Sequence, residues 1–198
     1  MKKHFALILS FVNLIICFIC FWYSDVLINR FFIFGIIPKG ICILLLLASL
    51  IISIVLIIRC RLVIKNYIAL AITIATILLL FVFPFRMAKV NLELSLYEED
   101  RLQIIQMIKK GELVGDKIGN VELPEGFSHL SSDGNVFIYQ NDNEHVISFW
   151  VFRGMLSGSV ELIYSSQNEA LIYKNETGHP ITSVLELKEH WYLVETDY

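Results

Sequence analysis

The hydrophobic pattern of the chain changes between residues 84 and 91. Before that point apolar residues form long unbroken runs, and after it they alternate with polar residues among Gly, Asn and Asp. Long apolar runs are typical of membrane-spanning helices, whereas alternation is typical of strands with one buried face. The pattern therefore predicts two parts that fold in different surroundings.

Three runs in the first part contain no charged residue: Phe5–Tyr23, Ile41–Ile58 and Tyr67–Phe85. Each is close to the roughly 20 residues that a helix needs to cross the hydrocarbon core of a bilayer. Because a backbone in lipid must satisfy its own hydrogen bonds, these runs are expected to be helical. The sequence predicts transmembrane helices at about residues 5–23, 41–58 and 67–85, the second with room to extend back toward Ile36.

The first run has an alternative interpretation as a cleaved signal peptide, because Lys2 and Lys3 give it a basic start. The run is longer than the usual apolar core of such a peptide, and no small-residue cleavage site follows it. Cys17 and Cys20 follow isoleucines, which does not fit lipoprotein processing. We interpret the run as a retained helix.

The second part opens with a predicted helix from about Leu96 to Lys110. Ser95 and Glu98 have the spacing of a capping box, and Gly111 suits the left-handed position after a helix. Strands are predicted by alternation at 136–140 and 145–152, joined by a turn at 141–144, and at 159–164. A short strand at 171–173 and a second hairpin, 183–187 with 191–195 around a turn at 188–190, complete the pattern.

We expect these strands to form an antiparallel meander with the helix on one face. Five aromatic residues are candidates for its core: Phe137, Phe149, Phe152, Tyr164 and Trp191. The predicted fold class is an α-helical membrane protein with three transmembrane helices, followed by an α+β soluble domain. The expected domains are residues 1–90 and 91–198.

Charge separates the same two parts. Residues 1–90 contain nine Lys or Arg and one acidic residue, Asp25, whereas residues 91–198 contain seven Lys or Arg and 18 acidic residues. A strongly acidic domain is unsuited to nucleic acid, which requires basic patches. The overall hydrophobic content of 56% exceeds the 45–50% typical of soluble domains, because the first part is so apolar.

The placement of Lys and Arg predicts orientation, because such residues are enriched in cytoplasmic loops. One side of the membrane receives Lys2, Lys3, Arg59, Arg61 and Lys65, and the other receives Arg30, Lys39, Arg86 and Lys89. The two sides differ by only one basic residue, five against four, and the dense cluster from Arg59 to Lys65 favours the cytoplasm for the first side. We expect a multi-pass cell-membrane protein with its N-terminus in the cytoplasm and its C-terminal domain outside.

The first loop, residues 24–40, is rich in aromatic residues and is expected to lie in the membrane interface next to Trp22 and Tyr23. Its alternative role is a docking surface for a partner.

Polar residues inside the spans are Ser10, Asn13, Ser49, Ser53, Thr73 and Thr76, and none is ionisable. An ion or proton pathway normally includes ionisable groups. We therefore expect structural packing, helped by small residues four apart at Ser49 and Ser53 and at Ala71 and Ala75. Cys17, Cys20, Cys42 and Cys60 are expected to be structural or to face lipid, with palmitoylation an alternative for Cys60.

The histidines of the second part, His129, His145, His179 and His190, lack the spacing of metal ligands. Asp116 and the pair Asp133 and Gly134 suit turns. The sequence therefore assigns no catalytic, cofactor-binding or metal-ligating residue.

Three short stretches carry a resemblance: residues 151–154, a strand ending in Ile163 and Tyr164, and a closing strand with Trp191 and Tyr192. They resemble an uncharacterised group of small Gram-positive bacterial membrane proteins, with apolar N-terminal helices and a short β-rich tail. The likeness covers roughly residues 121–198. It implies the same plan for this chain and assigns no activity or site residue.

These observations favour a non-enzymatic envelope anchor that presents a small interaction or sensing domain outside the membrane. Its expected partners are the lipid bilayer and either another protein or a second copy of the chain. The alternatives are a self-immunity protein against a membrane-active peptide, an accessory subunit of a membrane complex, and an enzyme whose site is assembled from distant residues.

Overall fold

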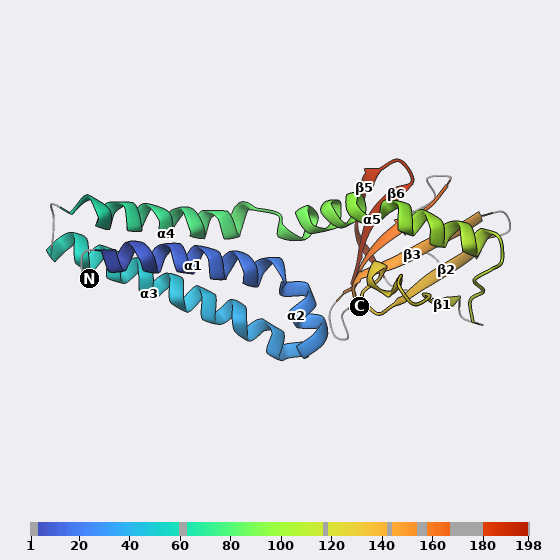
Figure 1. The fold of residues 1–198 in the computed structure, drawn as a ribbon, viewed down its shortest axis with the longest axis horizontal. Coiled ribbons are helices and arrows are strands. Elements are labelled where there is room, and N and C mark those ends of the chain that lie inside the picture. The colour runs from blue at the N-terminus through green and yellow to red at the C-terminus, as the bar shows by residue number, and fades with distance from the viewer. Residues whose placement is uncertain are drawn as a thin grey trace. The chain divides into compact units, whose positions relative to one another are not determined.

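The computed structural model describes residues 4–59, 63–116, 119–141, 144–153, 158–166 and 180–197. The chain divides into two compact units, Met1–Lys89 and Val90–Tyr198. Helices form the first unit, and the second contains an antiparallel sheet (Figure 1).

The first unit contains three long helices, α1 (Phe5–Trp22), α3 (Ile37–Arg59) and α4 (Ile64–Val82). Each is long and apolar enough to cross a membrane, the second as the stretch Phe34–Arg59. The three expected helices are thus confirmed, with boundaries shifted by a few residues. The second begins earlier than its charge-free run because Pro38 lies in its first turn, where a missing backbone N–H costs nothing.

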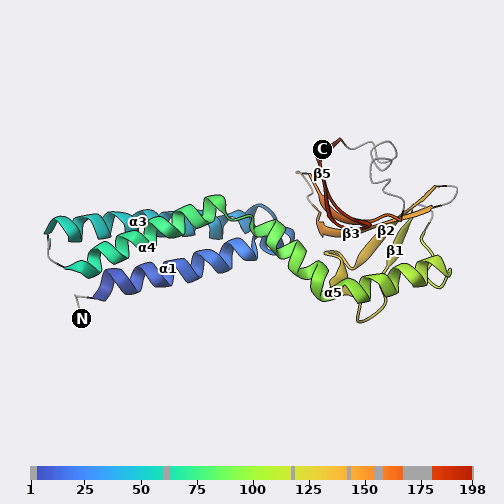
Figure 2. The same cartoon turned by 90° about the horizontal axis from the view of Figure 1, so that it is seen from above.

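The loop between the first two spans is itself helical. It forms α2 (Ser24–Phe31) and the 3₁₀ helix η2 (Phe32–Ile36). Asp25 lies in the first turn of α2 and Arg30 in its last, the placement that the helix dipole favours. The helices α1, α3 and α4 contact one another pairwise and form a three-helix bundle (Figures 1 and 2).

The helix α5 (Phe85–Lys109) consists of two helical stretches that meet at a kink at Tyr97. The helix expected from about Leu96 to Lys110 is therefore confirmed, and a further helical stretch that was not predicted precedes it. The stretch before Leu96 contains no Gly or Pro that would stop a helix. A break does occur next to the expected position, because Tyr97 has non-helical angles (φ −120°, ψ 17°). The predicted capping residue Glu98 instead forms an ion pair with Lys188, at 2.7 Å.

The end of α5 agrees with the sequence. Gly111 has φ of 74°, and its N–H donates to the carbonyl of Ile108 at 2.9 Å. The next residue, Glu112, donates to the carbonyl of Met107, also at 2.9 Å. These two bonds form a Schellman motif, which requires the left-handed conformation that glycine adopts without strain.

Six strands form one antiparallel sheet in the order β1-β2-β3-β4-β6-β5. Their bounds are β1 (Asn120–Glu122), β2 (Asn135–Asn141), β3 (Glu144–Phe152), β4 (Val160–Tyr164), β5 (Ile181–Lys188) and β6 (Trp191–Thr196). The two predicted hairpins and the strand between them are confirmed; β1 was not predicted. The predicted strand at 171–173 lies outside the described residues.

The meander prediction holds for β1 to β4 and is wrong for the last two strands. β4 pairs with β6, so the chain passes to the edge of the sheet for β5 before β6 returns beside β4. Alternation predicts that strands exist, but not which neighbour each one pairs with.

The sheet is curved, and α5 runs along one side of it (Figure 2). The side chains of Phe149 and Leu162 share that face, called here the helix face, and Arg101 and Lys109 of α5 lie over the rings of Phe149 and Tyr164. Of the aromatic residues expected in the core, Phe149, Phe152 and Trp191 are buried, whereas Phe137 and Tyr164 are only half-buried.

Candidate functional site

The interior of the helical bundle is polar and its outer surface is apolar. Buried positions recur three and four residues apart on one face of each helix: Ala6, Ser10, Asn13 and Cys17 in α1, Cys42, Leu46, Ser49 and Ser53 in α3, and Asn66, Ala69, Thr73 and Thr76 in α4. Large apolar side chains point outward, and Phe81 is 87% exposed. This distribution suits helices that pack through small residues and face lipid elsewhere.

Each long helix contributes one hydroxyl to a buried cluster, the hydroxyl triad of Ser10, Ser49 and Thr73. Ser10 Oγ lies 3.1 Å from Thr73 Oγ1 and 3.4 Å from Ser49 Oγ, and the last two are 3.3 Å apart. The carbonyl of Ala69 also lies 3.1 Å from Ser10 Oγ. The triad therefore links all three helices with hydrogen bonds whose groups would otherwise be unsatisfied in an apolar medium.

Two asparagine side chains add hydrogen bonds to backbone carbonyl groups of α3. Asn13 Nδ2 donates to the carbonyl of Leu45 at 3.2 Å, and Asn66 Nδ2 donates to the carbonyl of Leu56 at 3.3 Å. The polar residues that the sequence singled out are thus brought together in the core. The predicted packing role of Ala71 and Ala75 is wrong, because both are exposed; the polar residues determine which face of α4 turns inward.

Three cysteines also lie in the bundle, and Cys17, Cys20 and Cys42 are free thiols. Cys17 and Cys42 form an apolar cluster with Leu46, on which Cys20 packs. This placement supports a structural role. Cys60 lies outside the described residues.

An ion pair lies at one end of the bundle and a side-chain hydrogen bond at the other. Arg86 Nε lies 3.4 Å from Asp25 Oδ2 and ties α2 to the residues that follow α4. Lys65 Nζ lies 3.2 Å from His4 Nε2, which links the start of α1 to the start of α4. The expected interfacial connector is therefore fixed to the bundle by an ion pair.

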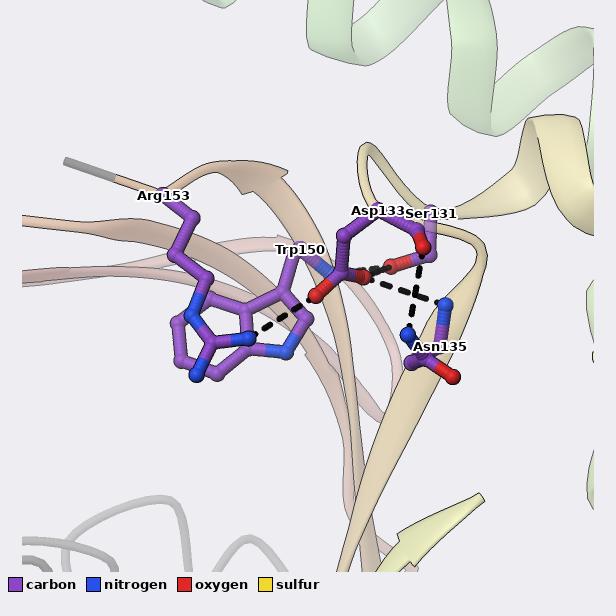
Figure 3. A network of polar contacts seen from close by, with 5 residues as sticks. All are labelled: Ser131, Asp133, Asn135, Trp150 and Arg153. Carbon is purple, nitrogen blue, oxygen red and sulfur yellow. Dashed lines mark hydrogen bonds and ion pairs between the residues drawn. The ribbon is translucent and has the colours of Figure 1, made fainter. Parts of the chain in front are cut away.

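Figure 3 shows a polar network in the second unit. Asp133 accepts hydrogen bonds from the backbone N–H of Asn135 at 3.0 Å and from Arg153 at 2.9 Å, and Arg153 lies over the ring of Trp150, 4.9 Å from its centre. Ser131 Oγ accepts from the Trp150 N–H at 2.9 Å. The network confirms the predicted turn at Asp133 and Gly134 and ties it to the end of β3.

A carboxylate is buried on the face of the sheet opposite α5. Glu161 is 2% exposed and accepts a 2.5 Å hydrogen bond from Ser148 Oγ. Ser159 Oγ lies 3.5 Å from the other carboxylate oxygen and 2.6 Å from Thr196 Oγ1. Beside these groups Val146, Ile163, Tyr192 and Val194 form a buried apolar cluster. The arrangement satisfies Glu161 with hydroxyl donors inside an apolar surrounding.

Arg101 is the corresponding buried cation on the helix face, 3% exposed. Its guanidinium donates to the carbonyl of Glu93 at 2.9 Å and to that of Leu130 at 3.4 Å. The carbonyl of Glu93 stands one turn before Tyr97, where a regular helix would supply the Tyr97 N–H as its donor. Burial lowers the pKa of Arg101, with nearby Glu93 opposing the shift. Arg101 therefore connects both halves of the broken helix to the 3₁₀ helix η3 (Ser128–Leu130).

The described histidines have separate surroundings. The ring of His129 packs edge-on against Tyr97, with centres 4.8 Å apart. His190 lies in the turn between β5 and β6 with φ of 69°. Among the residues that the structure describes, no group of three His, Cys, Asp or Glu has the geometry to hold a metal ion. His179 lies outside these residues.

Sequence reasoning missed Arg101 and Glu161. A Glu between Val160 and Leu162 is typical of a strand with one face exposed to solvent. In the structure both faces of β4 are buried, because β4 lies in the middle of the sheet between β3 and β6. Arg101 has no distinguishing signal among the charged residues of its helix.

Comparisons of this chain with protein families, with characterised proteins and with solved structures find no match.

Proposed function

We propose that the chain is a multi-pass protein of the cell membrane that anchors a small interaction or sensing domain outside the cytoplasm. The observation that carries the proposal is the reversed polarity of the bundle, with hydroxyl and amide groups inside and large apolar side chains outside. Such a bundle is stable in lipid and would aggregate in water.

The core of the bundle supports anchoring rather than transport. Ser10, Ser49 and Thr73 hydrogen-bond to one another, and each is 1% exposed. No Asp, Glu, Lys, Arg or His lies among the buried residues of the three long helices, where a proton or ion route would be expected to place them.

The buried charged residues of the second unit favour a binding role over a catalytic one. Glu161 and Arg101 are both buried and hydrogen-bonded to neighbouring groups. The unit carries a large excess of acidic residues, which attracts basic partners over long range.

Alkaline extraction of membranes tests the anchor. The full-length chain should remain in the pellet after carbonate washing, as a known integral protein does. A known peripheral protein should be released into the supernatant. Release of the chain into the supernatant would contradict the proposal. Copurification in mild detergent should then yield a stoichiometric partner.

A second role, self-protection against a membrane-active peptide, is favoured by the same acidic surface, because many such peptides are basic. Deleting the gene and exposing the cells to basic membrane-active peptides separates the two roles. Increased killing of the deletion strain supports self-protection, and unchanged survival supports the anchor alone.

A further inference from the structure

The strand β5 (Ile181–Lys188) forms an open edge of the sheet. Its side chains from Thr182 to Glu186 are exposed on both faces, with Val184 38% and Leu185 45% exposed. The central strand β4 has its first four residues buried. A strand added beside β5 would therefore find free space on both faces of the sheet for its side chains.

The backbone of this edge is suited to strand addition. In the part of the chain that the structure describes, β5 has one strand neighbour, β6. An edge strand presents a row of N–H and C=O groups to its open side, and extended peptides bind there by continuing the sheet. β5 contains no Pro or Gly, and the irregular pairings lie near its two ends. The opposite edge, β1, has only three residues.

Charge indicates what kind of strand fits. The β5–β6 hairpin carries three carboxylates and one lysine, and that lysine, Lys188, is already engaged by Glu98. Glu186 is exposed, and the side chain of Glu189 is 86% exposed. A second copy would bring the same negative charge to the contact, which opposes pairing. A basic strand would be attracted.

We propose that β5 binds an extended basic segment of a partner protein by strand addition. Apolar residues of that segment would contact Val184 on one face and Leu185 on the other, while its Lys or Arg residues pair with Glu186 and Glu189. The inference rests on the proposed function for the location of this edge outside the membrane.

The full-length protein in phosphatidylcholine nanodiscs tests the surface directly. The probe is a short extended peptide of alternating Lys and Val, and the control is the same peptide with alternate backbone amides methylated. The first peptide should slow hydrogen exchange at residues 183–186, and its affinity should fall as salt is added. The methylated peptide should bind at least about tenfold more weakly, because it cannot complete the hydrogen-bond ladder.

Charge reversal supplies the matched variants. Glu186→Lys with Glu189→Lys should weaken peptide binding about tenfold, whereas Glu112→Lys with Glu125→Lys, the same change elsewhere on the unit, should weaken it far less. Equal binding of the methylated peptide, or protection outside β5, would overturn the inference. Slow exchange at β5 caused by self-association without peptide would also overturn it, in favour of a second copy. If carbonate releases the chain while the peptide still protects β5, the anchor fails and the edge site stands.

Discussion

Arg101 is a buried cation whose hydrogen bonds join the two halves of α5 to the 3₁₀ helix that ends at Leu130. Replacing it by methionine keeps much of the apolar stem and removes a donor from two carbonyl groups. We expect Arg101→Met to lower the free energy of unfolding by about 2–4 kcal/mol. Chemical unfolding of the detergent-solubilised protein measures this change. Lys110→Met, at an exposed position just after the last residue of α5, should change it by less than about 0.5 kcal/mol, and equal losses would contradict the assigned role.

Ser148 donates to the buried carboxylate of Glu161. Ser148→Ala deprives that carboxylate of a donor in a site with little access to water, so we expect a loss of about 1–3 kcal/mol in unfolding free energy. The exposed Ser183 provides the control, and Ser183→Ala should be nearly neutral. Thermal unfolding of both variants checks the difference; a neutral Ser148→Ala would show that the hydrogen bond contributes nothing.

Tyr192 gives the fold a dependence on alkaline pH. Burial, helped by the nearby carboxylate of Glu186, raises the pKa of Tyr192 above its ordinary value of 10.0. The folded protein therefore retains this proton where the unfolded chain has lost it. Stability from Tyr192 is complete below pH 10 and falls as the pH rises through the folded pKa. Denaturant titrations across this range should show a smaller decline for Tyr192→Phe, and an identical decline would contradict the shift.

Single residues also show where sequence reasoning ends. The polar residues of the spans were identified correctly, because Ser, Asn and Thr stand out in an apolar run. Glu161 and Arg101 did not stand out, because their burial depends on which strands flank β4 and where α5 breaks. Both are consequences of tertiary pairing that alternation and composition do not encode.

At the scale of elements, the three long helices pack through faces of small and polar residues. Ser49 faces the other helices and Ala75 is exposed. Ser49→Leu should therefore separate the helices and lower the melting temperature of the solubilised protein, because a larger side chain cannot be accommodated in a packed core. Ala75→Leu, a similar gain in volume on the exposed face, should leave it nearly unchanged. A larger effect at Ala75 would restore the packing face first predicted from the sequence.

The elements differed in how well they could be predicted. Long charge-free runs and the glycine after α5 were reliable, because bilayer thickness and backbone geometry determine them directly. The helical stretch before the kink of α5, the short strand β1 and the pairing of β6 with β4 were not. Each of these depends on contacts far apart in the sequence.

At the scale of the whole molecule, the chain combines a basic apolar unit with an acidic polar one. The net charge is +8 for residues 1–90 and −11 for residues 91–198. An odd number of spans would place the N-terminus and the acidic unit on opposite sides of the bilayer. Basic residues retained on the cytoplasmic side would then determine the direction of insertion.

Labelling of single cysteines in intact cells tests this arrangement most directly. Ser132 is an exposed residue of the second unit, and the native Cys60 directly follows Arg59, the last residue of α3. Cys60 is therefore labelled in the unchanged chain, and Ser132→Cys is made in a background in which Cys60 is serine, so that every basic residue of the cluster is kept. A membrane-impermeant maleimide should label position 132 in intact cells and position 60 only after lysis. Labelling of position 60 in intact cells, or of position 132 only after lysis, would contradict the proposed orientation.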